Sequence, residues 1–199
     1  MVYNNFTKKI INLKEADLKL REKLILSGRL DDGYNPEMEQ LHIHNAIVLN
    51  EIIDIIGYPT FEKVGKEASD AAWLIIQHSI GNPDFMKKCK TLLEIAVGEG
   101  KAEPLHLAYL TDRIAVLEGK DQLYGTQFDW DGNGELSANT FDSIEKVNLR
   151  RKSLGLNSLE EQTEIMRERV KSENQLPPAD FEKRKQEMDN WRRRTGWLE

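Results

Sequence analysis

The sequence has only one cysteine, Cys89. A single thiol cannot form an internal disulfide, and the chain contains neither a Cys-x-x-Cys pair nor a Cys/His spacing typical of zinc sites. A reducing compartment is therefore permitted. The start of the chain, from Met1 to Lys9, is polar and lacks the apolar core of a secretion signal. Together these absences favour a cytoplasmic location.

The sequence also lacks a basic excess and a long apolar run. Lys and Arg number 28 against 34 Asp and Glu, so the formal net charge is -6, with both signs interspersed along the chain. Because no broad positive surface is available to neutralise phosphates, we expect no nucleic-acid partner. No uncharged apolar stretch reaches the roughly 18 residues that suggest a membrane span, so we expect no membrane partner either.

Apolar residues at helical spacing are the main feature that is present. They recur three and four positions apart in segments near residues 6–26, 37–56, 66–80, 83–97 and 104–119. Asn82 followed by Pro83 marks one helix start, because Asn accepts hydrogen bonds from free amides and Pro suits the first helical position. The sequence predicts a mainly α fold, a single-domain helical bundle of about seven or eight helices with one short β-hairpin.

Within that bundle we expect three parts: N-terminal helices over 1–56, a helical core with the hairpin over 57–172, and a C-terminal docking helix over 173–199. The apolar run between Ile43 and Ile56 leaves little room for a solvated face, which predicts a central helix. The last helix has a narrow apolar stripe of Phe181, Met188 and Trp191, so it must dock. We expect it to fold back on its own domain; the alternative is binding to another copy or to a different protein.

Turn and cap signals place the boundaries between these elements. Residues Asp31 to Pro36 are turn formers and predict a loop. Asn133-Gly134 is the preferred pair of a type I′ turn and predicts a hairpin near Gln127 to Thr140. The same stretch has some of the oxygen ligands of a calcium loop, but its twelfth position is Thr140, so the hairpin is favoured. Two capping boxes are predicted, Asp142 to Glu145 and Ser158 to Glu161.

Polar residues interrupt two of the apolar helices and meet the stretch Gln-Leu-Tyr-Gly-Thr-Gln at 122–127. We predict one polar pocket that binds a small anionic or amide-containing ligand. Its residues are Gln77, His78, Asp112, Arg113, Tyr124, Thr126 and Gln127. Arg113 would supply a planar, bidentate contact to a carboxylate or phosphate, and the two glutamines would orient the ligand.

Two hypotheses about function follow from this pocket. In the first, the protein is a non-catalytic ligand-binding or protein-interaction module, in which Asp112 or Arg113 belongs to a structural ion pair that ties its helix to a neighbour, and His78 caps its helix. In the second, it is a hydrolase or transferase in which Asp112 holds His78 as a general base and Arg113 or Tyr124 stabilises developing charge. The sequence contains no motif for a nucleophilic serine, no Cys-His pair and no phosphate-binding glycine loop. We expect no cofactor.

The other histidines predict no metal site. His42 and His44 are two residues apart, so on a helix they point in different directions and cannot share an ion. His106 stands near the start of a helix, on the same face as Arg113, where it would either join the pocket or lie on the surface. We therefore expect no metal ion at any of them.

Several short motifs together resemble a known family. They are Ala-Ala-Trp-Leu at 71–74, Gln77-His78, Tyr-Leu-Thr-Asp-Arg at 109–113, the stretch 122–127, and Arg150-Arg151 followed by Gly155-Leu156. This succession resembles an uncharacterised bacterial domain-of-unknown-function family, over about Gly57 to Met166. The resemblance implies a helical domain with a short hairpin, and no activity, cofactor or substrate. It leaves the N-terminal helix and the residues after about Lys171 outside the family.

Overall fold

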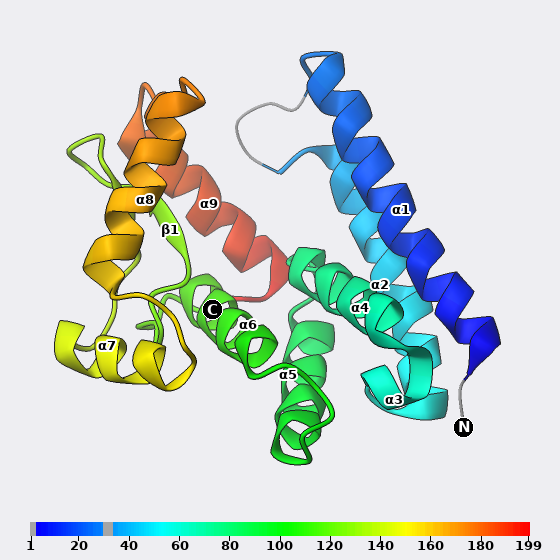
Figure 1. Ribbon diagram of the computed structural model, residues 1–199. Coiled ribbons are helices and arrows are strands. Elements are labelled where there is room, and N and C mark those ends of the chain that lie inside the picture. Colours follow the sequence, from blue (N-terminus) through cyan, green and yellow to red (C-terminus); the bar gives the residue numbers. More distant parts are fainter. Residues whose placement is uncertain (1–2, 30–33) are drawn as a thin grey trace. The chain divides into compact units, whose positions relative to one another are not determined.

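The computed structural model describes residues 3–29 and 34–199. Within those residues the chain forms nine α-helices and one two-stranded antiparallel sheet (Figure 1). The elements are α1 (Asn4–Leu26), α2 (Pro36–Ile56), α3 (Phe61–Val64), α4 (Lys66–His78), α5 (Pro83–Gly98), α6 (Pro104–Leu117), β1 (Phe128–Trp130), β2 (Leu136–Ala138), α7 (Ile144–Ser153), α8 (Leu159–Ser172) and α9 (Phe181–Thr195). The prediction of a mainly α fold with one hairpin is confirmed.

The chain divides into two compact units, Met1–His106 and Leu107–Glu199. The three-part division expected from the sequence stays a prediction. Of the loop predicted over residues 31–36, Asp31, Asp32 and Gly33 lie outside the described residues. None of the helices in the described ranges is long and apolar enough to cross a membrane.

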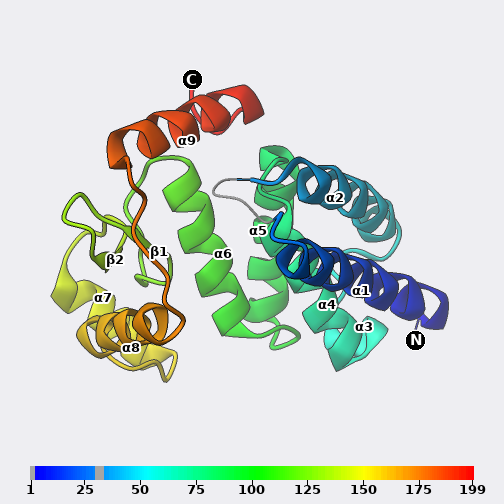
Figure 2. The same cartoon turned by 90° about the horizontal axis from the view of Figure 1, so that it is seen from above.

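In the first unit, α1 packs against both α2 and α4, as Figure 2 shows. The buried residues of α1 are Ile10, Leu13, Asp17 and Leu24, whose spacing places them on one face of the helix. The residues before α5 cap its first turn. The Asn82 side chain accepts a hydrogen bond from the Phe85 amide at 3.2 Å, and Pro83 occupies the first turn of α5, as predicted.

The prediction that α2 has little exposed surface is wrong. Ile43, Ile47 and Ile55 are 41%, 52% and 69% exposed. The buried positions of α2 lie on one side of the helix, and they include two polar residues, His42 and Asn45. α2 is therefore an amphipathic helix, although its sequence is almost continuously apolar. Its buried face includes the polar side chains of His42 and Asn45.

In the second unit, the hairpin lies between α8 and α9 (Figure 2). Its register pairs Phe128 with Ala138 and Trp130 with Leu136, which confirms the hairpin prediction. The predicted type I′ turn is wrong, because only Gly134 has a positive φ, +76°, and Asn133 does not. The Asp131 side chain accepts hydrogen bonds from the amides of Asn133 and Glu135, so a longer loop closes around that carboxylate.

One of the two predicted capping boxes is correct. Ser158 and Glu161 exchange hydrogen bonds with each other's backbone at the start of α8. The other, predicted over Asp142 to Glu145, is wrong: Ser143 caps α7 and accepts from the Lys146 amide, and the lysine at that position offers no acceptor in return. Asp142 instead receives two hydrogen bonds from Arg150, at 3.0 and 2.7 Å.

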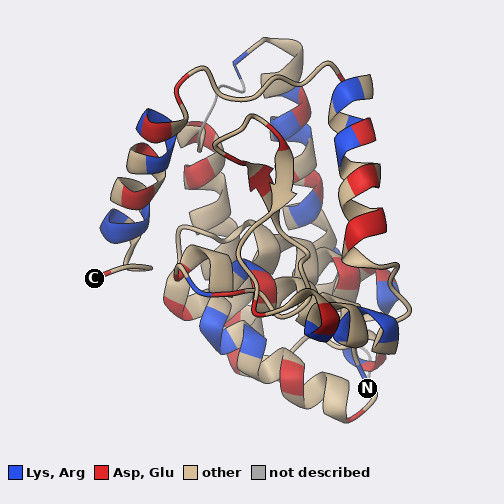
Figure 3. Ribbon diagram, turned by 90° about the vertical axis from the view of Figure 1, so that its left-hand side faces the viewer, with Lys and Arg blue, Asp and Glu red and all other residues tan. Residues whose placement is uncertain are grey.

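The C-terminal helix α9 folds back on its own unit. Lys and Arg alternate with Asp and Glu along it (Figure 3), and none of its residues is buried. Arg184 of α9 pairs with Asp129 of β1 at 2.8 Å, and Arg192 donates to the carbonyl of Val116 at the end of α6 at 3.0 Å. Beyond the helix, Trp197 is 5% exposed and anchors the end of the chain.

Candidate functional site

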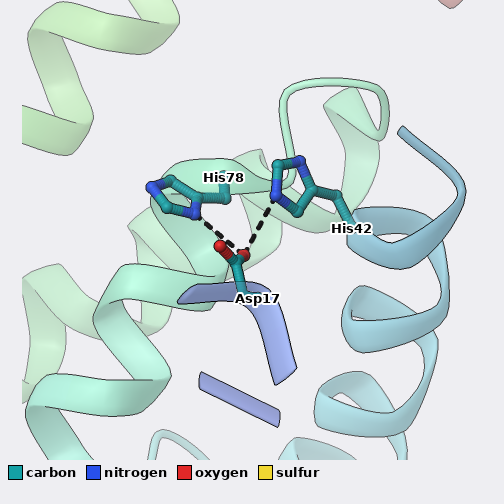
Figure 4. Close-up of side chains that lie close together, drawn as sticks. All are labelled: Asp17, His42 and His78. Carbon is teal, nitrogen blue, oxygen red and sulfur yellow. Dashed lines mark hydrogen bonds and ion pairs between the residues drawn. The ribbon is translucent and has the colours of Figure 1, made fainter. Parts of the chain in front are cut away.

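Three helices of the first unit each bring one polar side chain to a common point. Asp17 comes from α1, His42 from α2, and His78 is the last residue of α4 (Figure 4). Asp17 lies four residues after Leu13 on the buried face of α1, so the packing of that helix forces the carboxylate inward. We call these three residues the Asp17 cluster.

The geometry of the Asp17 cluster is tight. Asp17 Oδ2 lies 2.9 Å from His78 Nδ1 and 3.0 Å from His42 Nε2, and the two imidazole centroids are 5.1 Å apart. The Asp17 side chain is fully buried and that of His42 is 8% exposed, whereas that of His78 is 27% exposed. Figure 4 shows the second ring nitrogen of His78 pointing away from Asp17. His78 is thus the most accessible member of the cluster.

The charge of Asp17 is stabilised by imidazoles. Burial alone would raise the pKa of Asp17, but the contacts with His42 and His78 outweigh it and hold that pKa well below its usual range. An ionised carboxylate only accepts hydrogen bonds, so His78 Nδ1, which bonds to it, carries hydrogen. His42 Nε2 lies at ion-pair distance from the carboxylate without forming a hydrogen bond. Asp17 Oδ1 is buried and has no hydrogen-bond partner among the described residues. A buried anion with one unsatisfied oxygen is energetically costly unless a further ligand completes it.

Tyr34 supports the cluster from behind. Its hydroxyl lies 2.6 Å from His42 Nδ1 and 3.4 Å from the carbonyl oxygen of His78. Burial raises the pKa of Tyr34 far above its ordinary value, so the phenol stays neutral. A neutral phenol both donates and accepts. Tyr34 can therefore satisfy either tautomer of His42.

This set of side chains is suited to a metal ion. One ligand atom from each of Asp17, His42 and His78 lies within 4.8 Å of the others. Two imidazoles and one carboxylate form a common ligand set for zinc and for several other divalent transition metals. Three protein ligands leave a coordination position open for water or a substrate. The expectation that histidines form no metal site compared only His42 with His44, and His44 is exposed.

The residues predicted to form one pocket belong to two units. Gln77 and His78 lie in the first, and Asp112, Arg113, Tyr124, Thr126 and Gln127 lie in the second. A shared pocket therefore stays a prediction. The carboxylate that contacts His78 is Asp17, where we expected Asp112.

Asp112 has a different set of partners. It is fully buried on α6 and accepts hydrogen bonds from the amides of Leu123, Tyr124 and Thr126, at 2.8, 3.1 and 2.9 Å, and from the Thr126 hydroxyl at 3.0 Å. Successive amides that converge on one carboxylate form a small anion-binding nest. The Asp112 carboxylate is thus the anion that this nest binds, and its hydrogen bonds hold the loop 122–127 in place.

The rest of that loop is also held by protein groups. Arg113 Nε donates to Gln127 Oε1 at 3.1 Å, and burial lowers the pKa of Arg113. Arg151 is 2% exposed and donates to the carbonyl of Tyr124 at 3.0 Å. Gly125 has φ +61°, and a Cβ there would lie 2.7 Å from a methyl carbon of Leu159. These contacts give the conspicuous sequence motif a structural role, and ligand binding by Tyr124, Thr126 and Gln127 stays a prediction.

The sequence contained weak signals for the residues that were missed. Asp17 interrupts the apolar stripe of the first helix, and a charge on an apolar face indicates a buried partner. His42 stands four residues after Met38 on the buried face of α2. Neither signal names the partner, because the three residues lie on three helices that are separated in the sequence. Only tertiary packing brings them together.

His106 does not belong to the Asp17 cluster. Its ring stacks on Trp73 with centroids 4.2 Å apart, and the Trp73 indole donates to the His106 carbonyl at 3.2 Å. Burial lowers the pKa of His106. The aromatic stack gives His106 a packing role at the start of α6.

Comparison of the chain with curated proteins and with solved structures gives no match. The model of a family of unknown function, DUF6624, matches residues 4–171. This match includes the N-terminal helix and with it Asp17, so the expectation that the family begins near Gly57 is wrong. Because the match covers most of the sequence, the chain belongs to this family of unknown function.

Proposed function

We propose that the first unit binds a divalent transition-metal ion of the zinc type through Asp17, His42 and His78. The observation that supports this most directly is the buried Asp17 carboxylate, which lies between two imidazoles and leaves Oδ1 without a partner among the described residues. A cation would neutralise that charge and use the free oxygen lone pairs. Ligands from three packed helices would hold their positions before the ion arrives.

Tyr34 supports the same proposal. A histidine that binds a metal through one ring nitrogen usually donates the hydrogen on the other to a nearby acceptor, which fixes the tautomer. When His42 Nε2 binds the ion, Nδ1 carries the hydrogen and faces the Tyr34 hydroxyl at 2.6 Å. Tyr34 then donates its own hydrogen toward the His78 carbonyl at 3.4 Å. Each hydrogen in this series of hydrogen bonds, from His42 through Tyr34 to the His78 carbonyl, then has an acceptor.

Three protein ligands also suggest what the ion would do. A zinc-type ion with an open position binds water and lowers its pKa, or polarises a carbonyl or phosphoryl oxygen. Because His78 is the most exposed member of the cluster, its side is the one from which water or a substrate would arrive. Metal-assisted hydrolysis is the reaction class that fits these features.

The test is a metal titration of purified, chelator-treated protein. We expect Zn²⁺ and Co²⁺ to bind at one equivalent by calorimetry and to raise the melting temperature. Free metal at about 100 times its Kd would add roughly 2.7 kcal/mol to the free energy of unfolding. In His78→Gln the affinity should fall at least about tenfold, since even the loss of a residue that only orients a metal ligand costs that much.

His44→Gln is the matched control. His44 is exposed, lies on the same helix as His42, and is absent from the cluster. This variant should bind both metals like the wild type. Tyr34→Phe should weaken binding by about tenfold, because it removes the partner of His42 Nδ1. Equal metal affinity in His78→Gln and His44→Gln would overturn the proposal.

A second candidate function needs no metal. Asp17 orients His78 through Nδ1, so that the other ring nitrogen points away from the carboxylate and is available as a general base. In this case the wild type would show no specific metal uptake. Diethyl pyrocarbonate would acylate His78 of the metal-free protein faster than His44, and Asp17→Asn would remove the difference. Slow acylation of His78 would count against this candidate.

A further inference from the structure

The second unit contains a cleft that the Asp17 cluster does not explain. It lies between the hairpin and α9, with the end of α6 at its side, and has a volume of about 590 Å³. Sites for small molecules typically measure about 300–1,000 Å³. The cleft is thus large enough for a small organic ligand.

One face of α9 lines this cleft. Phe181, Lys185, Met188 and Arg192 all border it, and their spacing of four, three and four residues places them on the same side of the helix. No residue of α9 is buried, and Met188 is 41% exposed. The apolar stripe of this helix therefore remains only partly covered.

The hairpin supplies further apolar surface. Phe128 and Trp130 border the cleft and are alternate residues of β1, so they project to the same side of the strand. Both are only partly buried. Together with Phe181 they give the cleft three aromatic rings that a flat apolar molecule would cover.

The lining of the cleft includes four cationic side chains, Lys120, Arg184, Lys185 and Arg192, and three carboxylates, Asp129, Asp131 and Asp189. Asp129 is paired with Arg184, Asp189 is paired with Arg192, and Asp131 is engaged by its own turn and by the Ser137 hydroxyl. Lys185 has no ion-pair partner in the part of the chain that the structure describes. Arg192 Nε is buried and likewise has no hydrogen-bond partner among the described residues. Lys185 and the Nε donor of Arg192 both border the cleft, and the charge of Arg192 is already paired with Asp189.

We propose that this cleft binds a small organic anion with a flat apolar body, such as an aromatic carboxylate or sulfonate. The body covers the aromatic rings of the hairpin and of Phe181, and the anionic group meets Lys185 and Arg192. The ends of α9 are fixed by the Arg184–Asp129 pair and by the hydrogen bond from Arg192 to Val116. These contacts fix α9 beside the hairpin and the end of α6. The proposal does not depend on metal binding by the first unit.

The test uses two fluorescent probes that share a ring system. One is 8-anilinonaphthalene-1-sulfonate, an aromatic monoanion, and the other is the uncharged N-phenyl-1-naphthylamine. With the full-length protein at moderate salt, we expect the sulfonate to bind at one equivalent and at least about threefold more tightly than the uncharged probe.

Two lysines of α9 provide a matched pair of variants. Lys185 borders the cleft, whereas Lys183 does not and lies within reach of Glu187. Lys185→Gln should weaken binding of the sulfonate about threefold or more and leave the uncharged probe unchanged, and Lys183→Gln should bind both like the wild type. Met188→Ala should weaken both probes, because it removes apolar contact area from a side chain that borders the cleft and is 41% exposed. Equal effects of the two lysine variants, or equal binding of the two probes, would overturn the proposal.

Discussion

Two carboxylates of this chain, Asp17 and Asp112, are fully buried, but their surroundings differ. Asp112 is satisfied by backbone amides and a hydroxyl, whereas Asp17 faces two imidazoles and keeps one oxygen unpaired among the described residues. A satisfied buried carboxylate stabilises a loop, and an incompletely satisfied one is suited to a ligand. This contrast is consistent with a structural role for Asp112 and is the basis of the metal-binding role proposed for Asp17.

The structural role of Asp112 predicts a large loss of stability in Asp112→Ala. The substitution leaves the amides of Leu123, Tyr124 and Thr126 without their acceptor, and each buried unpaired group costs about 1–3 kcal/mol. We expect the free energy of unfolding in urea to fall by roughly 3 kcal/mol or more. Asp121→Ala, at an exposed position, should change it by less than about 0.5 kcal/mol. A small effect at Asp112 would contradict the proposed role of this nest.

Cys89 gives a second prediction for a single residue. It is fully buried on α5, and burial raises the pKa of its thiol to about 12. Only the thiolate attacks disulfide reagents, so the native protein should not react with 5,5′-dithiobis(2-nitrobenzoate) at pH 8 or pH 9. One equivalent should react after denaturation in guanidinium. Rapid reaction of the native protein would show that α5 opens readily.

At the scale of helices and strands, the sequence was informative wherever a signal was local. Asn82-Pro83 begins α5 and Ser158 to Glu161 caps α8, because the residues that form each cap are neighbours in the chain. The cap of α7 is Ser143 in place of Asp142, whose carboxylate is held by Arg150, a partner eight residues further along the chain. Local preference was overridden by a contact that spacing alone does not specify.

The candidate site could not be predicted in this way. Asp17, His42 and His78 carry no shared motif, since 25 and 36 residues separate them in turn and three helices must pack before they meet. The motif at 122–127 drew attention because its residues are contiguous, and its contacts are those of a well-supported loop. The contiguous motif thus has structural contacts, and the candidate site is formed by residues that are dispersed in the sequence.

The contact between Gly125 of this loop and Leu159 of α8 can be tested by mutation. Gly125 has φ +61°, and a methyl group there would meet Leu159 at 2.7 Å. Gly125→Ala should therefore lower the free energy of unfolding by about 2–3 kcal/mol, through both backbone strain and overpacking. In a Leu159→Ala background the overpacking disappears, so the same change should cost only about 1 kcal/mol. Additive effects in this double-mutant cycle would mean that the loop does not pack against Leu159.

At the scale of the whole molecule, the remaining question is what the C-terminal segment does for the second unit. The apolar stripe of α9 is too narrow to form a core of its own. It is anchored by Arg184 on Asp129, by Arg192 on the Val116 carbonyl, and by the buried Trp197. All of these partners belong to the same unit. The segment is therefore part of that unit's own fold.

Deletion of the chain from Gln175 onward tests this directly. The truncated protein loses the burial of Trp197 and the hydrogen bond to Val116, so its melting temperature should fall by several degrees, as expected for a loss of about 1–3 kcal/mol. Its oligomeric state in size-exclusion chromatography with light scattering should match that of the full chain, because the anchors of α9 lie within one chain.

Binding of the aromatic sulfonate to the truncated protein should disappear, since α9 forms one wall of the cleft. Metal affinity should stay unchanged, because Asp17, His42 and His78 all lie in the other unit. A full-length dimer that becomes a monomer on deletion would instead make α9 an assembly element, and its contacts with the hairpin would then be secondary to that role.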